Sequence, residues 1–185
     1  QADYLVVEST YGDRRHDAQD PMDALESIIT RTVRRGGSVI IPAFAVGRAQ
    51  ALLYYLYNLK AQARIPANLP VYLDSPMAIN ASELLCRHPN DHRLPPDLCA
   101  RVCDVARYTR TTEESKALDG NHGGMPRIIV SASGMATGGR ILHHCRVRLP
   151  RAENTLLITG YQGEGTLGRR LIEKATTVRI HKQEI

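Results

Sequence analysis

The stretch RIIVSASGMATGGR, residues 127–140, passes from an apolar run into a loop of small residues and ends on a charged side chain. Its first part, residues 127–132, predicts a buried β-strand, because a short apolar run bounded by turn residues is typical of a strand inside a sheet. The glycines and hydroxyl residues that follow predict a tight loop leading into a helix. The same order of strand, small-residue loop and helix is found around residues 42–48 and 74–78.

Strand-like and helix-like segments alternate along the rest of the chain. Strands are predicted over residues 5–9, 38–42, 71–74, 127–132, 155–159 and 177–180. This alternation is the pattern of a parallel sheet with crossover helices. The sequence therefore predicts an α/β fold, a Rossmann-like three-layer domain with a mainly parallel central sheet and helices on both faces.

Three helices are predicted from capping residues and apolar spacing. The first covers residues 20–35, where Asp20 and Pro21 suit a helix start and two glycines follow the end. The second covers residues 47–60, whose tyrosines are expected in the core rather than as a base-stacking platform. The third covers residues 76–88, after which an exposed connection and short helices are expected up to residue 124.

Length and charge restrict the class of protein. The chain has 185 residues, enough for one domain with a real core, and a formal net charge of +5, which favours an anionic partner. Its longest apolar runs are of strand length, and no cationic start leads into an apolar segment. A soluble, cytoplasmic protein without membrane contact is therefore expected.

The four cysteines, Cys86, Cys99, Cys103 and Cys145, contain no Cys-x-x-Cys pair. Such a pair is the spacing expected of a zinc knuckle or a redox motif. Free thiols in a reducing compartment are therefore expected. Cys99 and Cys103 lie one helical turn apart, which leaves a metal or a disulfide there as a less favoured alternative.

The small-residue loops predict an anion-binding crevice. In open parallel sheets the carboxyl ends of the strands face a cleft, and helix N-termini present free backbone N–H groups to an anion. The candidate phosphate-binding residues are Arg48, Ser131, Ser133, Gly134 and Arg140. No Walker loop is present, and no Gly-x-Gly-x-x-Gly fingerprint follows the first predicted strand. A glycine-rich turn that only permits close helix packing is the alternative.

Other candidate residues carry weaker signals. Glu8 ends a predicted strand, where a carboxylate can orient a histidine or accept a proton, although a surface acid or a cap is the simpler interpretation. His143 and His144 point in different directions on a helix, so at most one faces the cleft, and His144 is taken as the candidate phosphate contact. The pair His88 and His92 is not expected to bind metal, because Pro89 prevents a regular helix with both rings on one face.

Five segments together resemble one known family. They are ESTYG (8–12), GGSVIIPAFAVGRAQ (36–50), LDSPMA (73–78), SASGMATGGR (131–140) and GYQGEGTLGR (160–169). In this order, and over nearly the whole chain, they are similar to the β-CASP branch of the metallo-β-lactamase superfamily, the RNA-processing nucleases. The resemblance implies residues 1–12 as the end of the metallo-β-lactamase part, 13–152 as the β-CASP domain and 153–185 as a segment returning to the metallo-β-lactamase domain.

The resemblance also implies how such a nuclease works. Two zinc ions, held by a His-x-His-x-Asp-His run in the metallo-β-lactamase domain, activate a hydroxide that attacks phosphorus, and the β-CASP domain covers the RNA cleft. Glu8 matches the acidic residue of the first β-CASP motif, which supports a histidine further along the family's sequence. The zinc-ligand run is absent from this sequence, so no metal ligand is predicted here. An excised domain without activity of its own is expected.

The partners implied are single-stranded RNA and the metallo-β-lactamase domain of the same parent chain, and the resemblance also allows a homodimer. Two other classes of function stay open at this point. A free-standing nucleotide-binding module would use the same strand ends and would bind a mononucleotide saturably. A purely structural lid would bind neither RNA nor nucleotide. The sequence does not decide between endonuclease and exonuclease.

Overall fold

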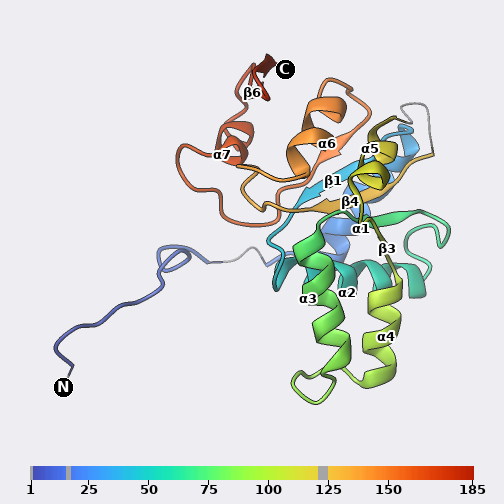
Figure 1. Cartoon of the computed structure of the whole chain (residues 1–185), viewed down its shortest axis with the longest axis vertical. Coiled ribbons are helices and arrows are strands. Elements are labelled where there is room, and N and C mark those ends of the chain that lie inside the picture. Colours follow the sequence, from blue (N-terminus) through green and yellow to red (C-terminus); the bar gives the residue numbers. More distant parts are fainter. Residues whose placement is uncertain (1, 16–17, 121–124) are drawn as a thin grey trace.

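A five-stranded parallel sheet forms the centre of the computed structural model, which describes residues 2–15, 18–120 and 125–185 (Figure 1). The strand order is β3-β2-β4-β1-β5. The strands are β1 (Val39–Pro42), β2 (Val71–Leu73), β3 (Arg107–Tyr108), β4 (Ile128–Ser131) and β5 (Thr155–Leu156). This confirms the α/β fold with a parallel central sheet.

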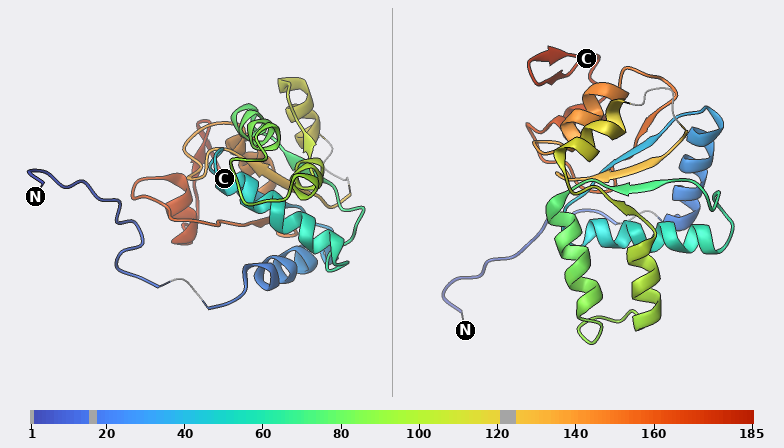
Figure 2. Two further views of the ribbon diagram at one scale, coloured as in Figure 1. Left: turned by 90° about the horizontal axis from the view of Figure 1, so that it is seen from below. Right: turned by 45° about the vertical axis from the view of Figure 1, so that its right-hand side comes forward.

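Helices cover both faces of this sheet, as Figures 1 and 2 show. One face carries α1 (Pro21–Arg34), α2 (Arg48–Ala61), α3 (Pro76–Arg87) and α4 (Pro96–Asp104). The other face carries α5 (Thr112–Gly120) and α6 (Ile141–Arg148), with α7 (Leu167–Ile172) beside them. The three layers expected from the sequence are therefore present.

Neighbouring residues of β1 pack into different cores. Val39 and Ile41 belong to the large apolar cluster beneath α1 to α4, whereas Ile40 belongs to the smaller cluster formed with α6 and the C-terminal segment. Successive side chains of a strand point to opposite faces, so a strand buried on both sides needs apolar residues at every position. The tyrosines of α2 (Tyr54, Tyr55 and Tyr57) also pack against the large cluster, as expected.

The helix starts follow their capping residues. Asp20 caps α1, its carboxylate accepting a hydrogen bond of 2.6 Å from the amide of Met22, and Pro21 is the first helical residue. Ser75 caps α3 in the same way, and Pro76 follows it. Side-chain caps of this kind satisfy amides that have no partner inside the helix. The predicted boundaries of α1, α2 and α3 agree with the structure to within one or two residues.

Three predicted strands are wrong or incomplete. Of residues 155–159, only Thr155–Leu156 form a strand. Residues 5–9 are extended but belong to no strand, and Val6 is 95% exposed. A β-strand is stabilised by backbone hydrogen bonds to a neighbouring strand, and no described segment lies alongside residues 5–9 to form them. The segment 177–180 contributes β6 (Arg179–Ile180) to an antiparallel hairpin with β7 (Gln183–Glu184), not to the central sheet.

The cysteine prediction is partly wrong. Cys86 of α3 and Cys103 of α4 form a disulfide, because antiparallel packing of the two helices brings their side chains together. Cys99 and Cys145 are free and buried, as expected. Short helices do occur before residue 120, and residues 121–124 lie outside the part that the structure describes. No described helix combines the length and apolar character needed to cross a membrane.

Candidate functional site

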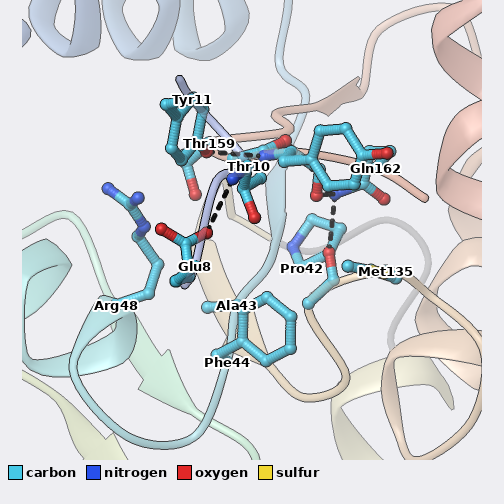
Figure 3. A pocket seen from close by; sticks show the side chains of 13 residues that line it. Glu8, Thr10, Tyr11, Pro42, Ala43, Phe44, Arg48, Met135, Thr159 and Gln162 are labelled. Atoms are coloured by element: carbon cyan, nitrogen blue, oxygen red, sulfur yellow. Dashed lines mark hydrogen bonds between the residues drawn. The ribbon is translucent and has the colours of Figure 1, made fainter. Parts of the chain in front are cut away.

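A cleft of about 290 Å³ opens at the carboxyl ends of β1, β4 and β5 (Figure 3). Each of these strands contributes the loop that follows it, and the N-terminal segment crosses the opening. The lining residues are Glu8, Thr10, Tyr11, Pro42, Ala43, Phe44, Arg48, Gly134, Met135, Thr159, Gly160, Tyr161 and Gln162. A cleft at this edge is where ligands bind to open parallel sheets, so the predicted location agrees with the structure.

Gln50 holds the loop between β1 and α2 in place. Its Oε1 accepts a hydrogen bond of 2.7 Å from the amide of Gly47, and its Nε2 donates to Ser82 Oγ of α3 at 3.0 Å. Gly47 has φ = 81°, a left-handed conformation that glycine adopts without strain. The turn places Arg48 at the start of α2 with its side chain toward the cleft (Figure 3). Among the described residues, nothing pairs with its guanidinium.

The loop after β4 packs directly on the loop after β1. A Cβ atom on Gly134 would lie 2.9 Å from both the backbone nitrogen and the ring of Phe44. Ser133 stabilises the same turn, because its Oγ accepts a hydrogen bond of 3.0 Å from the amide of Thr137. The glycine therefore allows the two loops to approach, and the hydroxyl of Ser133 is used in a turn at the cleft's edge.

Gln162 and Tyr11 attach the loop after β5 and the N-terminal segment to this site. Gln162 is buried and donates hydrogen bonds to the carbonyl oxygens of Gly134, at 3.0 Å, and Gly160, at 3.3 Å. The amide of Tyr161 donates to the hydroxyl of Tyr11 at 2.9 Å. Segments far apart in the sequence are thus joined around one opening.

Glu8 is the acidic residue of the cleft. Its side chain is exposed and accepts a hydrogen bond of 2.9 Å from the amide of Thr10. Hydrogen bonds from Thr10 lower the pKa of the Glu8 carboxyl below its usual value. Glu8 is therefore a carboxylate at neutral pH, able to hold the N–H of an imidazole or another donor that enters the cleft.

Exposed aromatic rings stand beside arginines here. Phe44, the only phenylalanine of the sequence, is 51% exposed, and Tyr11 and Tyr161 are 37% and 36% exposed. A second hollow of about 410 Å³ shares Tyr11, Arg48 and Tyr161 with the cleft and adds Arg14 and Arg169. Aromatic faces next to arginines are the combination that binds single-stranded nucleic acid without reading its sequence.

Three of the predicted phosphate-binding residues are engaged inside the fold instead. Arg140 donates to Asp74 Oδ1 at 2.8 Å and also to the carbonyl oxygens of Thr109 and Arg110. Ser131 donates to the backbone oxygen of Asp74 at 2.7 Å. Neither side chain lines the cleft, so the structure brings only Glu8, Arg48 and Gly134 of the predicted set into it, with Ser133 at its edge.

His144, the third of them, is completely buried between two carboxylates. Its Nε2 lies 2.6 Å from Asp74 Oδ2, and its Nδ1 lies 2.7 Å from Asp119 Oδ1. Burial disfavours the protonated ring, but the hydrogen bonds with Asp119 and Asp74 outweigh it and raise the pKa of His144. For Asp74 burial likewise opposes ionisation, but the hydrogen bonds from His144 and Ser115 lower its pKa. His144 and Asp74 therefore form an ion pair inside the fold.

Sequence reasoning overlooked several residues of the site. Tyr11, Phe44 and Gln162 lie within the five segments quoted above, yet no role was predicted for them. Their signal is modest: each is a large side chain among small residues in a loop that follows or precedes a strand. Asp74 carries the same kind of signal, as a carboxylate directly after β2, and the partners of its carboxylate come from two distant segments, α5 and the beginning of α6.

Comparison with known proteins assigns the family. The profile of the Beta-Casp domain matches residues 49–171. Ribonuclease TTHA0252 of Thermus thermophilus is 38% identical over 192 aligned residues, which cover 100% of this chain and 43% of that protein. An RNase J-like protein of Methanocaldococcus jannaschii is 35% identical, with 100% and 43% covered. The transcription termination factor FttA of Lokiarchaeum sp. is 34% identical, with 91% and 27% covered.

The chain thus spans less than half the length of these curated relatives. The family profile covers more than half of the chain, and it includes α2, the glycine-rich loop after β4 and most of the loop after β5. The two loops supply the cleft residues from Gly134 to Gln162, whereas the other lining residues, from Glu8 to Arg48, precede the matched range. The chain therefore belongs to the Beta-Casp domain family.

Proposed function

We propose that this chain is the RNA-positioning domain of a ribonuclease of the metallo-β-lactamase superfamily. The observation that carries the proposal is the cleft, where the rings of Tyr11, Phe44 and Tyr161 are exposed beside the guanidinium of Arg48, which pairs with none of the described residues. Two relatives that match the whole chain are a ribonuclease and an RNase J-like protein, which supports RNA as the ligand. The net charge of +5 favours a polyanion.

The zinc pair that this superfamily implies does not fit the cleft. Zinc prefers imidazole, thiolate and carboxylate ligands in a set of three or four. Of these donors, the described residues lining the cleft offer only the carboxylate of Glu8. We therefore assign no metal to this cleft. Hydrolysis of the phosphodiester bond is proposed to belong to the longer protein, whose other segments would supply the ligands.

The residues of this chain bind and orient the substrate. The Arg48 guanidinium would neutralise a backbone phosphate, which fixes the position of the strand without reading its bases. Arg14 and Arg169 of the adjoining hollow are ion-paired with Asp13 and Glu173, and would exchange these partners to contact further phosphates. The exposed rings would stack against unpaired bases. The Glu8 carboxylate would repel phosphate but hold a donor, so it is proposed to orient a histidine of the longer protein.

Equilibrium binding of a short single-stranded RNA to the chain, measured by fluorescence anisotropy over a series of salt concentrations, tests this proposal. Binding should weaken as salt rises. Arg48→Ala should reduce the slope of log K against log salt by about 0.7, because the variant neutralises one phosphate fewer. Arg31→Ala removes the same charge from an exposed position on α1 outside the cleft and should leave the slope nearly unchanged.

Three results would contradict the proposal. One is equal slopes for the Arg48 and Arg31 variants, which would place the RNA elsewhere. Another is saturable binding of a mononucleotide that displaces the RNA completely, which would favour a nucleotide-binding module. The third is cleavage of the RNA by the purified chain in added zinc, which would give it a metal centre of its own.

A further inference from the structure

Three cysteines come together between α3 and α4. Cys86 lies near the end of α3, and Cys99 and Cys103 lie one turn apart on α4. Their sulfur atoms are all within 4.8 Å of one another, and Cys99 is only 1% exposed. Within residues 2–15, 18–120 and 125–185, this is the one group of three or more metal-ligating side chains so close together.

Two of the separations around Cys99 are close to the edges of a tetrahedral metal site. Zinc–sulfur bonds of about 2.3 Å at tetrahedral angles place two sulfurs about 3.8 Å apart, and a zinc–nitrogen bond of about 2.0 Å places nitrogen and sulfur about 3.6 Å apart. The structure has Cys86 Sγ 3.5 Å from Cys99 Sγ, and His92 Nε2 3.6 Å from Cys99 Sγ. Cys86 and Cys103 are bonded to each other here, and His92 Nε2 is not within 4.8 Å of all three sulfurs, so a Cys₃His set requires reduction of the disulfide and a closer approach of His92.

A disulfide alone does not account for this arrangement. Cys86 and Cys103 are bonded to each other, and their Cα atoms are 7.0 Å apart, just beyond the usual range of about 4.4–6.8 Å. A disulfide uses two sulfurs and gives no role to a third. Yet Cys99 is buried against the pair, and an imidazole lies beside it.

We propose that the reduced chain binds one Zn²⁺ through the thiolates of Cys86, Cys99 and Cys103, with His92 Nε2 as the fourth ligand. A phosphine reductant opens the disulfide; water gives its oxygen to phosphorus and a proton to each sulfur. Zinc then displaces one proton from each of the three thiols. The proposal does not depend on the proposed RNA function.

His92 must change one hydrogen bond when it becomes a ligand. In the disulfide form its Nε2 lies 3.0 Å from the carbonyl oxygen of Leu85, and its Nδ1 accepts a hydrogen bond from the amide of Leu94. Nε2 therefore carries the proton. Coordination through Nε2 moves that proton to Nδ1, so Nδ1 no longer accepts from the Leu94 amide and the connecting loop shifts locally.

Such a site would join the two helices of one projecting unit. Figures 1 and 2 show α3 and α4 side by side, extending away from the sheet and connected by the loop that contains His92. Four protein ligands leave no open position on the zinc, so the site would be structural rather than catalytic. It would fix the outer end of the α3–α4 pair.

Titration of the phosphine-reduced chain with Co²⁺, followed by competition with Zn²⁺, tests the site. Thiolate-to-cobalt charge-transfer bands and strong tetrahedral d–d bands are expected at one equivalent per chain. Cys99→Ser is the decisive variant, because it leaves the Cys86–Cys103 pair intact. It should weaken zinc binding by more than the roughly 10–100-fold typical of losing a residue that merely supports a ligand. Cys145→Ser, a buried free cysteine outside the group, is the matched control and should not change binding.

Absence of thiolate–cobalt bands in the reduced chain would overturn the proposal, as would equal zinc affinities of the Cys99 and Cys145 variants. An unchanged affinity in His92→Ala would overturn the fourth ligand. If circular dichroism shows that Cys99→Ser does not fold, alkylation of the reduced wild-type chain still tests the zinc site. Zinc should then protect the partly exposed Cys86 and Cys103 from alkylation, and equal alkylation with and without zinc would refute the site.

Discussion

At the scale of single residues, the buried His144 makes stability depend on pH. Its pKa is raised above the ordinary value of 6.5, so its ion pairs with Asp74 and Asp119 stabilise the fold fully below about that pH. This contribution is lost as the pH rises through the raised pKa. The lowered pKa of Asp74 acts at the acid end, where stability is lost as the pH falls through it.

We expect the free energy of unfolding, measured by urea denaturation between pH 6 and pH 9, to fall more steeply in the wild-type chain than in His144→Gln. The glutamine keeps a hydrogen bond but cannot titrate. At pH 6 this variant should be less stable by roughly 1–3 kcal/mol, because a charged hydrogen bond is removed from a buried site. Parallel pH profiles would show that His144 is not protonated in the fold.

The contact between the loops after β1 and β4 predicts that the fold is sensitive to a substitution at Gly134. Gly134→Ala would place a methyl group against the backbone and ring of Phe44, so we expect a loss of about 1–3 kcal/mol in unfolding free energy. Gly138→Ala is the control, because a Cβ atom there meets nothing within 4 Å. Thermal and urea unfolding measure the stability of both variants. Equal stabilities of Gly134→Ala and Gly138→Ala would mean that the two loops separate easily to accommodate the methyl group.

The sequence located this site better than it assigned the side chains. Strand ends followed by small residues identified the correct edge of the sheet, because all parallel strands present their carboxyl ends there. It did not anticipate that Ser131, Arg140 and His144 are all engaged with Asp74, the residue directly after β2. Local sequence shows which side chains could bind phosphate, but not which distant group already occupies them.

At the scale of elements, α1 depends on its cap. The Asp20 carboxylate satisfies the amide of Met22, so Asp20→Ala should lower the unfolding free energy by about 1 kcal/mol. Asp20→Asn keeps an acceptor at the same place and should cost only a few tenths of a kcal/mol. Urea denaturation of both variants checks this, and equal losses would exclude the cap as the cause.

The elements themselves were predictable where the signal is local. Capping residues and apolar spacing gave α1, α2 and α3, and continuous apolar runs gave β1, β2 and β4. Pairing is not a local property. The run at residues 5–9 has strand-like composition without a strand beside it, and β6 pairs with β7 across a two-residue turn instead of joining the sheet.

At the scale of the whole molecule, the N-terminal segment exposes a continuous apolar surface. Tyr4, Leu5, Val6 and Val7 are 67–95% exposed, and their backbone groups belong to no sheet. Extended apolar segments with unpaired backbone tend to pair with other chains. We expect the chain to self-associate with rising concentration in sedimentation velocity, and the double variant Leu5→Ser, Val7→Ser to reduce this association.

Leu84→Ser is the matched control, since Leu84 is 50% exposed but lies on a helix whose backbone is already hydrogen-bonded. It should leave self-association unchanged. If it has the same effect as the double variant, general surface hydrophobicity and not the extended segment drives the association.

The hydrogen bond between the Tyr161 amide and the Tyr11 hydroxyl has a thermodynamic consequence. It couples the position of the N-terminal segment to the loop after β5, and both line the cleft. A molecule that contacts both would bind more weakly whenever the segment is detached. By reciprocity, the bound molecule must hold the segment in place by the same factor. Occupancy of the cleft and attachment of the N-terminal segment are therefore linked equilibria. Amide hydrogen exchange at Tyr161 would slow when the cleft is occupied, because the hydrogen bond to Tyr11 is then kept for longer.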